Sequence, residues 1–418
     1  MKIPLSKPDI GQREIELVTS VLSSGQLSLG PRLVEFERKF AAYIGIRYAV
    51  AVNSGTSALH LCVKALGIGA NDEVLTTSFS FVASANCVLY EGARPVFVDI
   101  DPSTLNIDPA RMNATIARDY SWDGKCLTNR RSGRVLKAIL PVHVFGLPCD
   151  MAPILQTADA FNLRVIEDSC EALGATYRGQ PVGTFGDVGV FAFYPNKQMT
   201  TGEGGMIVTN DARVASACRS LRNQGRDDEA GWLRHVHLGY NYRLSELHCA
   251  VGLAQLERVD RLLQSRDRVA ELYTRGLAGI PELALPTLCP GRKRSWFVYV
   301  VRLRGASAAR NREILIQALT AHDIACQTYF PSIHQQPYLR GLHSPSAAPL
   351  PHTETASEAC LALPFFPSMT EEQVEEVCAT VRSTLAGQVR SRDRLPIGTP
   401  MQGPQISTRQ RGESIVVR

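Results

Sequence analysis

The 418-residue sequence has no long hydrophobic run. No apolar stretch reaches the roughly 18 residues that a membrane span requires. The first residues, MKIPLSKPDIGQ, have no hydrophobic core like that of a signal peptide. We therefore expect a cytoplasmic protein without a membrane span.

The sequence also has no metal-binding motif and little excess charge outside its tail. Its eleven cysteines form no CxxC pair and no His/Cys cluster, and most have apolar neighbours. This pattern predicts buried thiols rather than disulfides or a metal site. The formal charge is +5, but the residues after Ala386 carry six arginines against Asp393 and Glu413. The body is therefore close to neutral, which argues against a nucleic-acid-binding face.

Strands that are almost entirely apolar alternate with helical segments over the first 260 residues. The expected strands cover residues 48–52, 73–76, 95–98, 135–142, 163–166 and 188–193, with 206–209 beside the last. This order predicts an α/β fold with a mostly parallel sheet covered on both faces. We expect a polar surface excursion at 219–236 and a helix at 245–263 that begins at a Ser245 cap.

The composition changes after this helix. A strand at 296–303 and helices at 311–322 and 370–385 predict a smaller α+β domain, with a hinge near 260–280. The predicted division is a large domain at 1–262, a small domain at 263–386 and a tail at 387–418. The tail is rich in arginine, proline and glycine and has no period, which predicts disorder, with an attachment segment as the alternative.

Lys197 lies in the stretch DVGVFAFYPNKQMTTGEGG, which spans residues 187–205. The strand before it carries Lys197 to the carboxyl edge of the sheet, where ligands bind in such folds. A phosphate-binding P-loop is excluded, because the glycines follow the lysine and no GK[ST] sequence occurs. We interpret Lys197 as a lysine that forms a Schiff base with pyridoxal phosphate (PLP).

Three further features are expected at the same edge. Residues 53–57 (NSGTS) join a strand to a helix and suit an anion, although an ordinary capped helix has the same pattern. Phe79 and Phe81 follow a second strand, and His143 a third. Asp168 lies at the end of a further strand. Capping of a following helix is the alternative role for this residue. PLP needs a phosphate cradle, a stacking surface, a carboxylate for its ring nitrogen and a lysine.

The sequence resembles the DegT/DnrJ/EryC1/StrS family of PLP-dependent nucleotide-sugar aminotransferases over residues 1–385. The motifs that carry the resemblance are NSGTSALHL, EDSCEALGA, FYPNKQMTTGEGG, GYNYRLSELHCAVGLAQLERVD and PSIHQQPYL. The resemblance implies PLP fold type I, as in aspartate aminotransferase. It also implies a homodimer whose two active sites lie at the subunit interface.

The resemblance assigns catalytic roles to two residues. Lys197 matches the lysine that binds PLP and Asp168 the acid that pairs with its ring nitrogen. Cofactor-binding positions are matched by Gly55, Thr56, Ser57, Phe81, Glu171 and Asn241, the last reaching the phosphate from the partner subunit. His334 and Tyr194 are weaker candidates for the substrate site.

Ala192 departs from the family pattern, since many members have a phosphate-binding serine five residues before the lysine. Either Tyr194, Asn196 or the partner chain replaces this contact, or the phosphate is held with one hydroxyl fewer. The departure leaves the PLP assignment standing and concerns only the phosphate end of the site.

The resemblance implies ping-pong transfer of an amino group, through a lysine aldimine, from an amino acid such as L-glutamate to a nucleotide-linked keto-sugar. Such enzymes serve polysaccharide or antibiotic sugar biosynthesis. One alternative is a PLP-dependent sugar dehydratase, but those relatives carry histidine at the lysine position. Another is a non-catalytic regulatory protein, which we would expect to have lost Lys197 or Asp168. Glu171 is similar to the residue in some perosamine-type 4-aminotransferases, while the sugar and ring carbon are not predicted.

Overall fold

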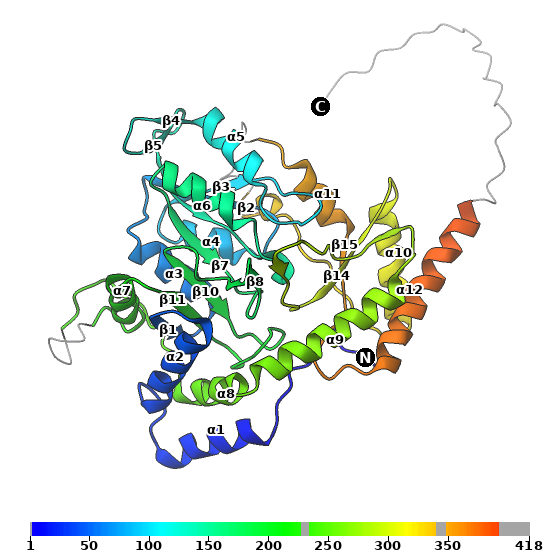
Figure 1. The fold of residues 1–418 in the computed structure, drawn as a ribbon, viewed down its shortest axis with the longest axis horizontal. Helices are drawn as coiled ribbons and strands as arrows, with labels where there is room; N and C mark the ends of the chain where they lie inside the picture. Colours follow the sequence, from blue (N-terminus) through cyan, green and yellow to red (C-terminus); the bar gives the residue numbers. More distant parts are fainter. Residues whose placement is uncertain (1, 227–233, 340–347, 393–418) are drawn as a thin grey trace, which may run out of the picture.

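The computed structural model describes residues 2–226, 234–339 and 348–392 (Figure 1). They form a large central sheet with helices on both faces and a smaller α+β part. The central sheet has nine strands, and seven of them follow the order β1-β11-β10-β7-β6-β2-β3. The remaining pair, β4 and β5, attaches to β6. The strands are β1 (Tyr48–Val52), β2 (Asp72–Thr77), β3 (Arg94–Val98), β4 (Tyr120–Trp122), β5 (Leu127–Asn129), β6 (Val135–Leu140), β7 (Arg164–Asp168), β10 (Val188–Ala192) and β11 (Gly205–Thr209).

The central sheet is mixed but mostly parallel, as predicted. Strands β10, β7, β6, β2 and β3 run parallel to one another. Strand β11 is antiparallel to both of its neighbours, β1 and β10, so β1 again has the common direction. The carboxyl ends of β1, β2, β6, β7 and β10 therefore meet at one edge.

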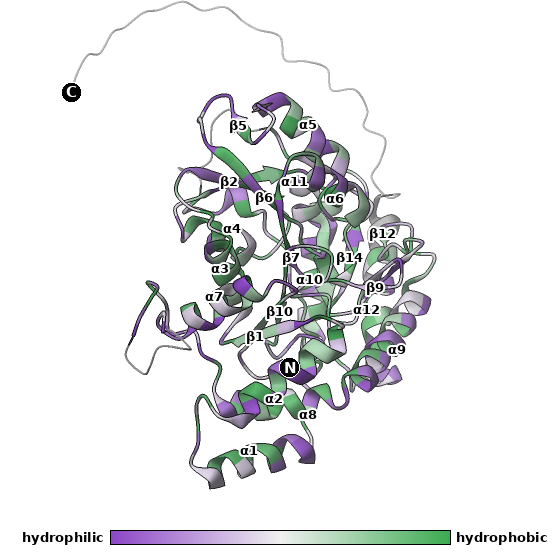
Figure 2. Cartoon of the chain, turned by 60° about the vertical axis from the view of Figure 1, so that its left-hand side comes forward, coloured by the Kyte–Doolittle hydropathy of each residue, from purple (hydrophilic) through white to green (hydrophobic). Residues whose placement is uncertain are grey.

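Helices cover both faces because alternate strand residues point to opposite sides. On β1, Val50 and Val52 pack with α3 and α7, whereas Ala49 and Ala51 pack with α2 and α8. Helices α5 and α6 cover the second face near β2 and β6. Figure 2 shows the central strands as mostly hydrophobic, with hydrophilic residues on outer helices such as α9.

Helices of the large part precede, connect and follow the strands of the central sheet. They are α1 (Gln12–Ser24), α2 (Pro31–Ile44), α3 (Gly55–Ala65), α4 (Ala83–Leu89), α5 (Pro109–Asp119), α6 (Met151–Ala160), α7 (Ala212–Arg222), α8 (Glu246–Leu256) and α9 (Val259–Leu277). No helix in the described part of the chain is long and apolar enough to cross a membrane.

A second core forms the smaller part of the protein. It contains a three-stranded sheet with helices α10 and α12 packed against it, and α11 lies nearby. The elements are β12 (Leu283–Ala284), β14 (Tyr299–Leu303), β15 (Cys360–Leu363), α10 (Ala308–Ala321), α11 (Pro351–Ala359) and α12 (Glu371–Arg392). A third small sheet joins β8 (Thr176–Tyr177), β9 (Gln180–Pro181) and β13 (Arg292–Lys293).

Helix α9 runs without a break across the predicted domain boundary at 262/263 (Figure 1). Its first turn packs into the large core through Val259 and Leu262. From Val269 onward its apolar face packs into the second core. Ile3 also lies in that second core, although it is the third residue of the chain. The division at 262 remains a prediction, and the structure shows one helix serving both cores.

Three local predictions were wrong in part. The expected surface excursion at 219–236 begins as the end of α7, where Arg222 is buried and binds Glu37 and the Ala51 carbonyl, and its residues 227–233 lie outside the described residues. Ser245 does cap α8, but the predicted helix to residue 263 breaks at residues 257–258. Residues 387–392 extend α12 rather than belonging to a disordered tail, and residues 393–418 lie outside the described residues.

All eleven cysteines are free. Seven are buried and the other four are half-buried. The prediction that most cysteines are buried thiols rather than disulfides is therefore confirmed. Burial raises the pKa of most of these thiols, as for Cys360, whose pKa is about 12.

Candidate active site

Lys197 lies in the loop that follows β10, at the carboxyl edge of the sheet. Its backbone N–H donates to the Tyr194 carbonyl at 2.9 Å, which forms a turn. Its Nζ lies 3.9 Å from the centroid of the Phe297 ring and 3.9 Å from Oε1 of Glu171. The side chain is only 14% exposed. The amine is thus held between an aromatic face and a carboxylate, with little contact to solvent.

Glu171 is buried and is held by the backbone around it. Its Oε2 accepts a hydrogen bond from the Phe145 N–H at 2.8 Å. Phe145 has a left-handed backbone (φ 52°), a conformation that is strained for a residue with a side chain. Burial raises the pKa of Glu171 to about 7, and the Lys197 charge partly opposes this rise. Glu171 can therefore bind or release a proton near neutral pH.

Asp168 is the last residue of β7 and is 5% exposed. Its Oδ2 accepts from the Ser84 hydroxyl at 2.8 Å and its Oδ1 from the Cys170 N–H at 3.1 Å. The alternative of a helix-capping aspartate is wrong, because the following residues form turns. The carboxylate is fixed by two donors in a buried position, as a partner for a cationic ring nitrogen would be.

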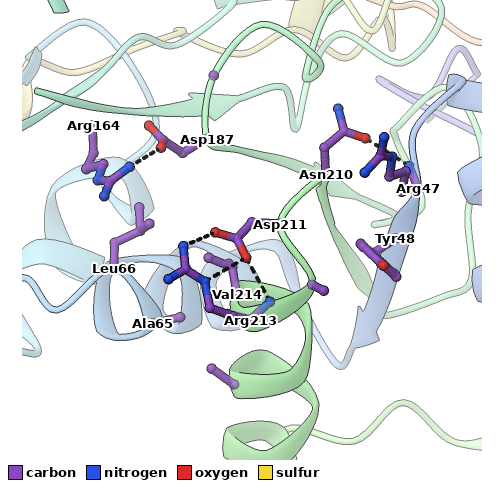
Figure 3. A pocket seen from close by; sticks show the side chains of 13 residues that line it. Arg47, Tyr48, Ala65, Leu66, Arg164, Asp187, Asn210, Asp211, Arg213 and Val214 are labelled. Atoms are coloured by element: carbon purple, nitrogen blue, oxygen red, sulfur yellow. Dashed lines mark hydrogen bonds and ion pairs between the residues drawn. The ribbon is translucent and has the colours of Figure 1, made fainter.

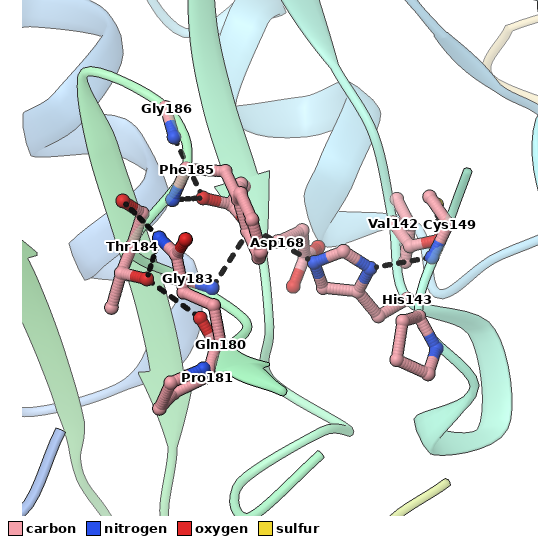
Figure 4. A network of polar contacts seen from close by, with 12 residues as sticks. Val142, His143, Cys149, Asp168, Gln180, Pro181, Gly183, Thr184, Phe185 and Gly186 are labelled. Atoms are coloured by element: carbon pink, nitrogen blue, oxygen red, sulfur yellow. Dashed lines mark hydrogen bonds and ion pairs between the residues drawn. The ribbon is translucent and has the colours of Figure 1, made fainter. Parts of the chain in front are cut away.

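Glu167 precedes Asp168 and points to the other side of the strand. Its carboxylate accepts from the backbone N–H groups of residues 183, 185 and 186 at 2.6–2.8 Å. His143 Nε2 lies 3.2 Å from the same carboxylate, while His143 Nδ1 accepts from the Cys149 N–H (Figure 4). That second bond leaves Nε2 as the protonated nitrogen. His143 thus lies at the expected strand end but serves to hold the strand beside Asp168.

The predicted anion site lies at the N-terminus of α3. Ser54 caps this helix by accepting from the Ser57 N–H at 3.1 Å. The capped-helix interpretation is therefore correct, and anion binding by the first-turn N–H groups of Gly55 and Thr56 remains a prediction. A Cβ on Gly55 would lie 2.8 Å from the Ala192 Cβ. The turn thus packs directly on the end of β10, five residues before Lys197.

Four further predicted residues are Phe81, Tyr194, Asn241 and His334. Phe81 and Tyr194 are 61% and 52% exposed. Asn241 is exposed and lies beside Asn223. His334 Nδ1 is 2.7 Å from the Ser78 hydroxyl and its Nε2 is 3.1 Å from Glu354, so both nitrogens have partners within the chain. Their roles remain predictions.

The sequence reasoning missed three residues next to Lys197. Phe297 lies under the amine, and the Tyr329 ring stacks near Phe297 with centroids 6.3 Å apart. Burial and the neighbouring Glu171 charge raise the pKa of Tyr329. Arg266 binds the Lys197 carbonyl at 2.6 Å. The only signal in the sequence that Arg266 is buried was its position among the apolar residues of α9.

A large surface cavity of about 880 Å³ lies at the opposite edge of the sheet (Figure 3). It is lined by residues at the amino ends of β1, β7 and β10, among them Tyr48, Arg164 and Asp187. Arg164 pairs with Asp187 at 2.7 Å. Since Lys197 and Asp168 lie at the carboxyl ends of these strands, this cavity is not part of the candidate active site.

The residues at the carboxyl edge fit PLP. The side-chain oxygens of Asn53 and Asn196 are buried without a hydrogen-bond partner in the described part of the chain. A Cβ on Gly205 would lie 2.4 Å from the Ser54 carbonyl, so the turn before α3 is closely enclosed. Free N–H groups, a buried carboxylate and an amine are the donors and acceptors that PLP requires.

Comparison with known proteins agrees with this arrangement. Residues 8–382 match the DegT/DnrJ/EryC1/StrS aminotransferase family. The chain is 40% identical over 399 residues to GDP-perosamine synthase of Caulobacter vibrioides, covering 92% of this chain and 98% of that protein. It is 37% identical over 396 residues to the spore coat polysaccharide biosynthesis protein SpsC of Bacillus subtilis, covering 92% and 97%.

Solved structures give the same result. DesV of S. venezuelae, in complex with a ketimine intermediate, has a TM-score of 0.81 at 33% identity and covers 92% of this chain and 98% of its own. PseC of Helicobacter pylori, an aminotransferase of pseudoaminic acid biosynthesis, has a TM-score of 0.82 at 29% identity, covering 92% and 99%. The chain therefore belongs to the DegT/DnrJ/EryC1/StrS family of sugar aminotransferases, which depend on PLP.

Proposed function

We propose that this protein transfers an amino group from L-glutamate to a nucleotide-linked keto-sugar by ping-pong chemistry, with Lys197 as the lysine that binds PLP. The observation that carries the proposal is the position of the Lys197 amine, 3.9 Å from Glu171 and enclosed at the same sheet edge as Asp168. The retained lysine and acid also argue against the dehydratase and non-catalytic alternatives.

Each residue of the site has a distinct task. PLP, when bound, supplies an electron sink for the bonding electrons of the donor Cα. Asp168 holds a proton on the ring nitrogen through its buried carboxylate. With PLP bound, the Lys197 amine would act as the general base and acid that takes and returns a proton. Gly55, Thr56 and Ser57 bind the phosphate.

Exposed residues support the predicted homodimer with shared active sites. Asn241 is exposed, and the Tyr242 carbonyl beside it accepts from the Asn53 N–H at 2.9 Å. This hydrogen bond connects residues 241–242 to the end of β1, directly before the turn that is proposed to bind the phosphate. Leu238 is 85% exposed in the same segment. We propose that a second copy covers this surface and that Asn241 reaches the partner's phosphate.

The relatives narrow the choice of substrate. The name of GDP-perosamine synthase includes a GDP-linked sugar, and SpsC is described as a polysaccharide biosynthesis protein. We therefore propose GDP-linked keto-sugars as the first substrates to test, with UDP- and dTDP-linked sugars as comparisons. The cytoplasmic location stays a prediction.

The test begins with the visible spectrum of the purified protein loaded with PLP. Addition of L-glutamate is expected to convert the spectrum to that of the pyridoxamine form, and a keto-sugar should then restore it with formation of an amino-sugar. Lys197→Ala is expected to lose the lysine-bound absorption band and all turnover. A variant that keeps both would refute the role of Lys197, and loss of a sugar hydroxyl without amination would favour the dehydratase.

A further inference from the structure

Arg266 is an arginine buried inside the protein near Lys197. It lies on α9 and is 2% exposed, which makes it one of the largest fully buried side chains. No acidic side chain in the described ranges forms an ion pair with it. Burial lowers the pKa of Arg266 to about 9. A buried charge without a counter-charge is costly, so neighbouring groups must compensate it.

The groups that compensate Arg266 are backbone carbonyls on two separate segments. Its Nη2 donates to the Lys197 carbonyl at 2.6 Å and to the Asn196 carbonyl at 3.3 Å. Its Nη1 donates to the Phe297 carbonyl at 3.2 Å. The guanidinium carbon also lies 5.7 Å from the centroid of the Phe365 ring. One guanidinium thus joins α9, the loop after β10 and the segment that leads into β14.

Two of these carbonyls belong to Lys197 and Phe297, whose side chains are in contact at the candidate active site. Lys197 Nζ lies 3.9 Å from the centroid of the Phe297 ring. Arg266 holds the backbone of both partners in this contact. A shift of either segment would change where the amine lies relative to the ring and to Glu171.

We propose that Arg266 is a positioning residue that sets the location of the Lys197 amine for its reaction with PLP. This inference rests on the role of Lys197 in the proposed function. The planar fork of arginine can bind two segments in fixed directions, which a lysine ammonium cannot do. A displacement of the reacting amine by an ångström would slow its attack on an aldehyde, because attack requires a defined approach.

The experiment measures covalent attachment of PLP to Lys197, which is independent of the substrate. Apo-protein is mixed with PLP, the absorbance is followed over time, and the product is reduced with borohydride and located by peptide mass spectrometry. The variants are Arg266→Met and Arg266→Lys, compared with wild type. Tyr273→Phe is the matched control, since Tyr273 lies on the same helix, is fully buried and donates to the Pro364 carbonyl at 2.8 Å. Thermal unfolding is recorded for each protein.

We expect attachment at Lys197 to slow about 100-fold in Arg266→Met and about 10-fold in Arg266→Lys, in line with the sensitivity of rates to small misplacements. Tyr273→Phe should lower the unfolding temperature and leave the attachment rate unchanged. If both Arg266 variants attach PLP at the wild-type rate, the proposal is overturned. If Arg266→Met does not fold, the rate of Arg266→Lys decides alone. Attachment of PLP to a lysine other than Lys197 in wild type would instead refute the proposed function.

Discussion

Gly55 and Ala192 lie so close together that a Cβ on Gly55 would come within 2.8 Å of the Ala192 Cβ. The same Cβ would lie 3.0 Å from the Cys170 sulfur. The first turn of α3 is therefore seated on the end of β10 with no space between them. Ala192, the position at which the sequence departs from the family pattern, therefore contacts the turn that is predicted to bind phosphate.

Gly55→Ala is expected to weaken PLP binding. The added methyl must displace the first turn of α3 by several tenths of an ångström, and overpacking of this kind costs about 1–3 kcal/mol. The Kd for PLP, measured by titration of apo-protein, should rise about tenfold or more. Gly69→Ala is the control, since its nearest neighbour would be the Glu91 carbonyl at 3.9 Å. Equal Kd values for the two variants would contradict the close seating of α3.

Ser84→Ala should reduce the effectiveness of Asp168 without removing it. The substitution takes away the 2.8 Å hydrogen bond to Oδ2 but leaves the bond from the Cys170 N–H. Loss of one hydrogen bond to a charged group costs about 1–3 kcal/mol. We expect kcat to fall by less than in Asp168→Asn, with the expressed protein still folded. A larger loss in Ser84→Ala than in Asp168→Asn would show that Ser84 acts by another route.

Glu171 should make the apo-protein less stable as the pH rises. Its pKa is 4.5 in the unfolded chain and about 7 in the folded protein, so the folded state binds the proton more tightly. The resulting stabilisation is complete below pH 4.5 and is lost as the pH rises through 7. It amounts to at most about 3 kcal/mol.

The free energy of unfolding, measured with urea at pH 5 and pH 8, is expected to fall more in wild type than in Glu171→Gln. The amide cannot ionise, so the variant lacks this contribution. Glu358→Gln on the exposed side of α11 is the control and should behave as wild type. A Glu171→Gln protein with the wild-type pH dependence would show that the buried carboxyl does not titrate in this range.

Glu91→Gln is expected to loosen the segment that carries Asn241. The Glu91 carboxylate accepts hydrogen bonds from Lys64 and Tyr240 at 2.8 Å and lies 2.7 Å from His60 Nε2. Burial raises the pKa of Glu91, but its hydrogen bonds outweigh this and lower it overall. The bound carboxylate therefore stabilises the fold above the unfolded pKa, and this contribution is lost as the pH falls.

The substitution should cost about 2 kcal/mol at pH 7, with a smaller difference from wild type at pH 4. Thermal unfolding at the two pH values measures this. Lys64→Met removes only one of the three partners and is expected to cost less. If Glu91→Gln also weakens PLP binding while Lys64→Met does not, the result would support the predicted role of Asn241.

Much of the site could be predicted because parallel strands bring their carboxyl ends to one edge. Lys197, Asp168 and the turn before α3 each follow a short apolar run, and that local signal placed them together. The limit of such reasoning shows at Arg222 and in the break between α8 and α9. Arg222 is charged, so the sequence predicts a surface position, and its burial becomes clear only from its ion pair with Glu37. A continuous apolar stripe likewise does not indicate the residue at which one helix ends and the next begins.

The sequence by itself determined the family, the α/β architecture and the chemistry available at Lys197 and Asp168, since strand periodicity, turn composition and motif order are local properties. Only the tertiary structure decided what surrounds the lysine amine. Phe297 and Arg266 meet Lys197 because α9 and the segment before β14 pack against the loop after β10, while Glu171 reaches the amine from the turn after β7. Their contacts join segments up to 100 residues apart in the chain. The direction of β11 was likewise settled by pairing between distant strands, because hydrogen bonding across a sheet leaves no signal within either strand.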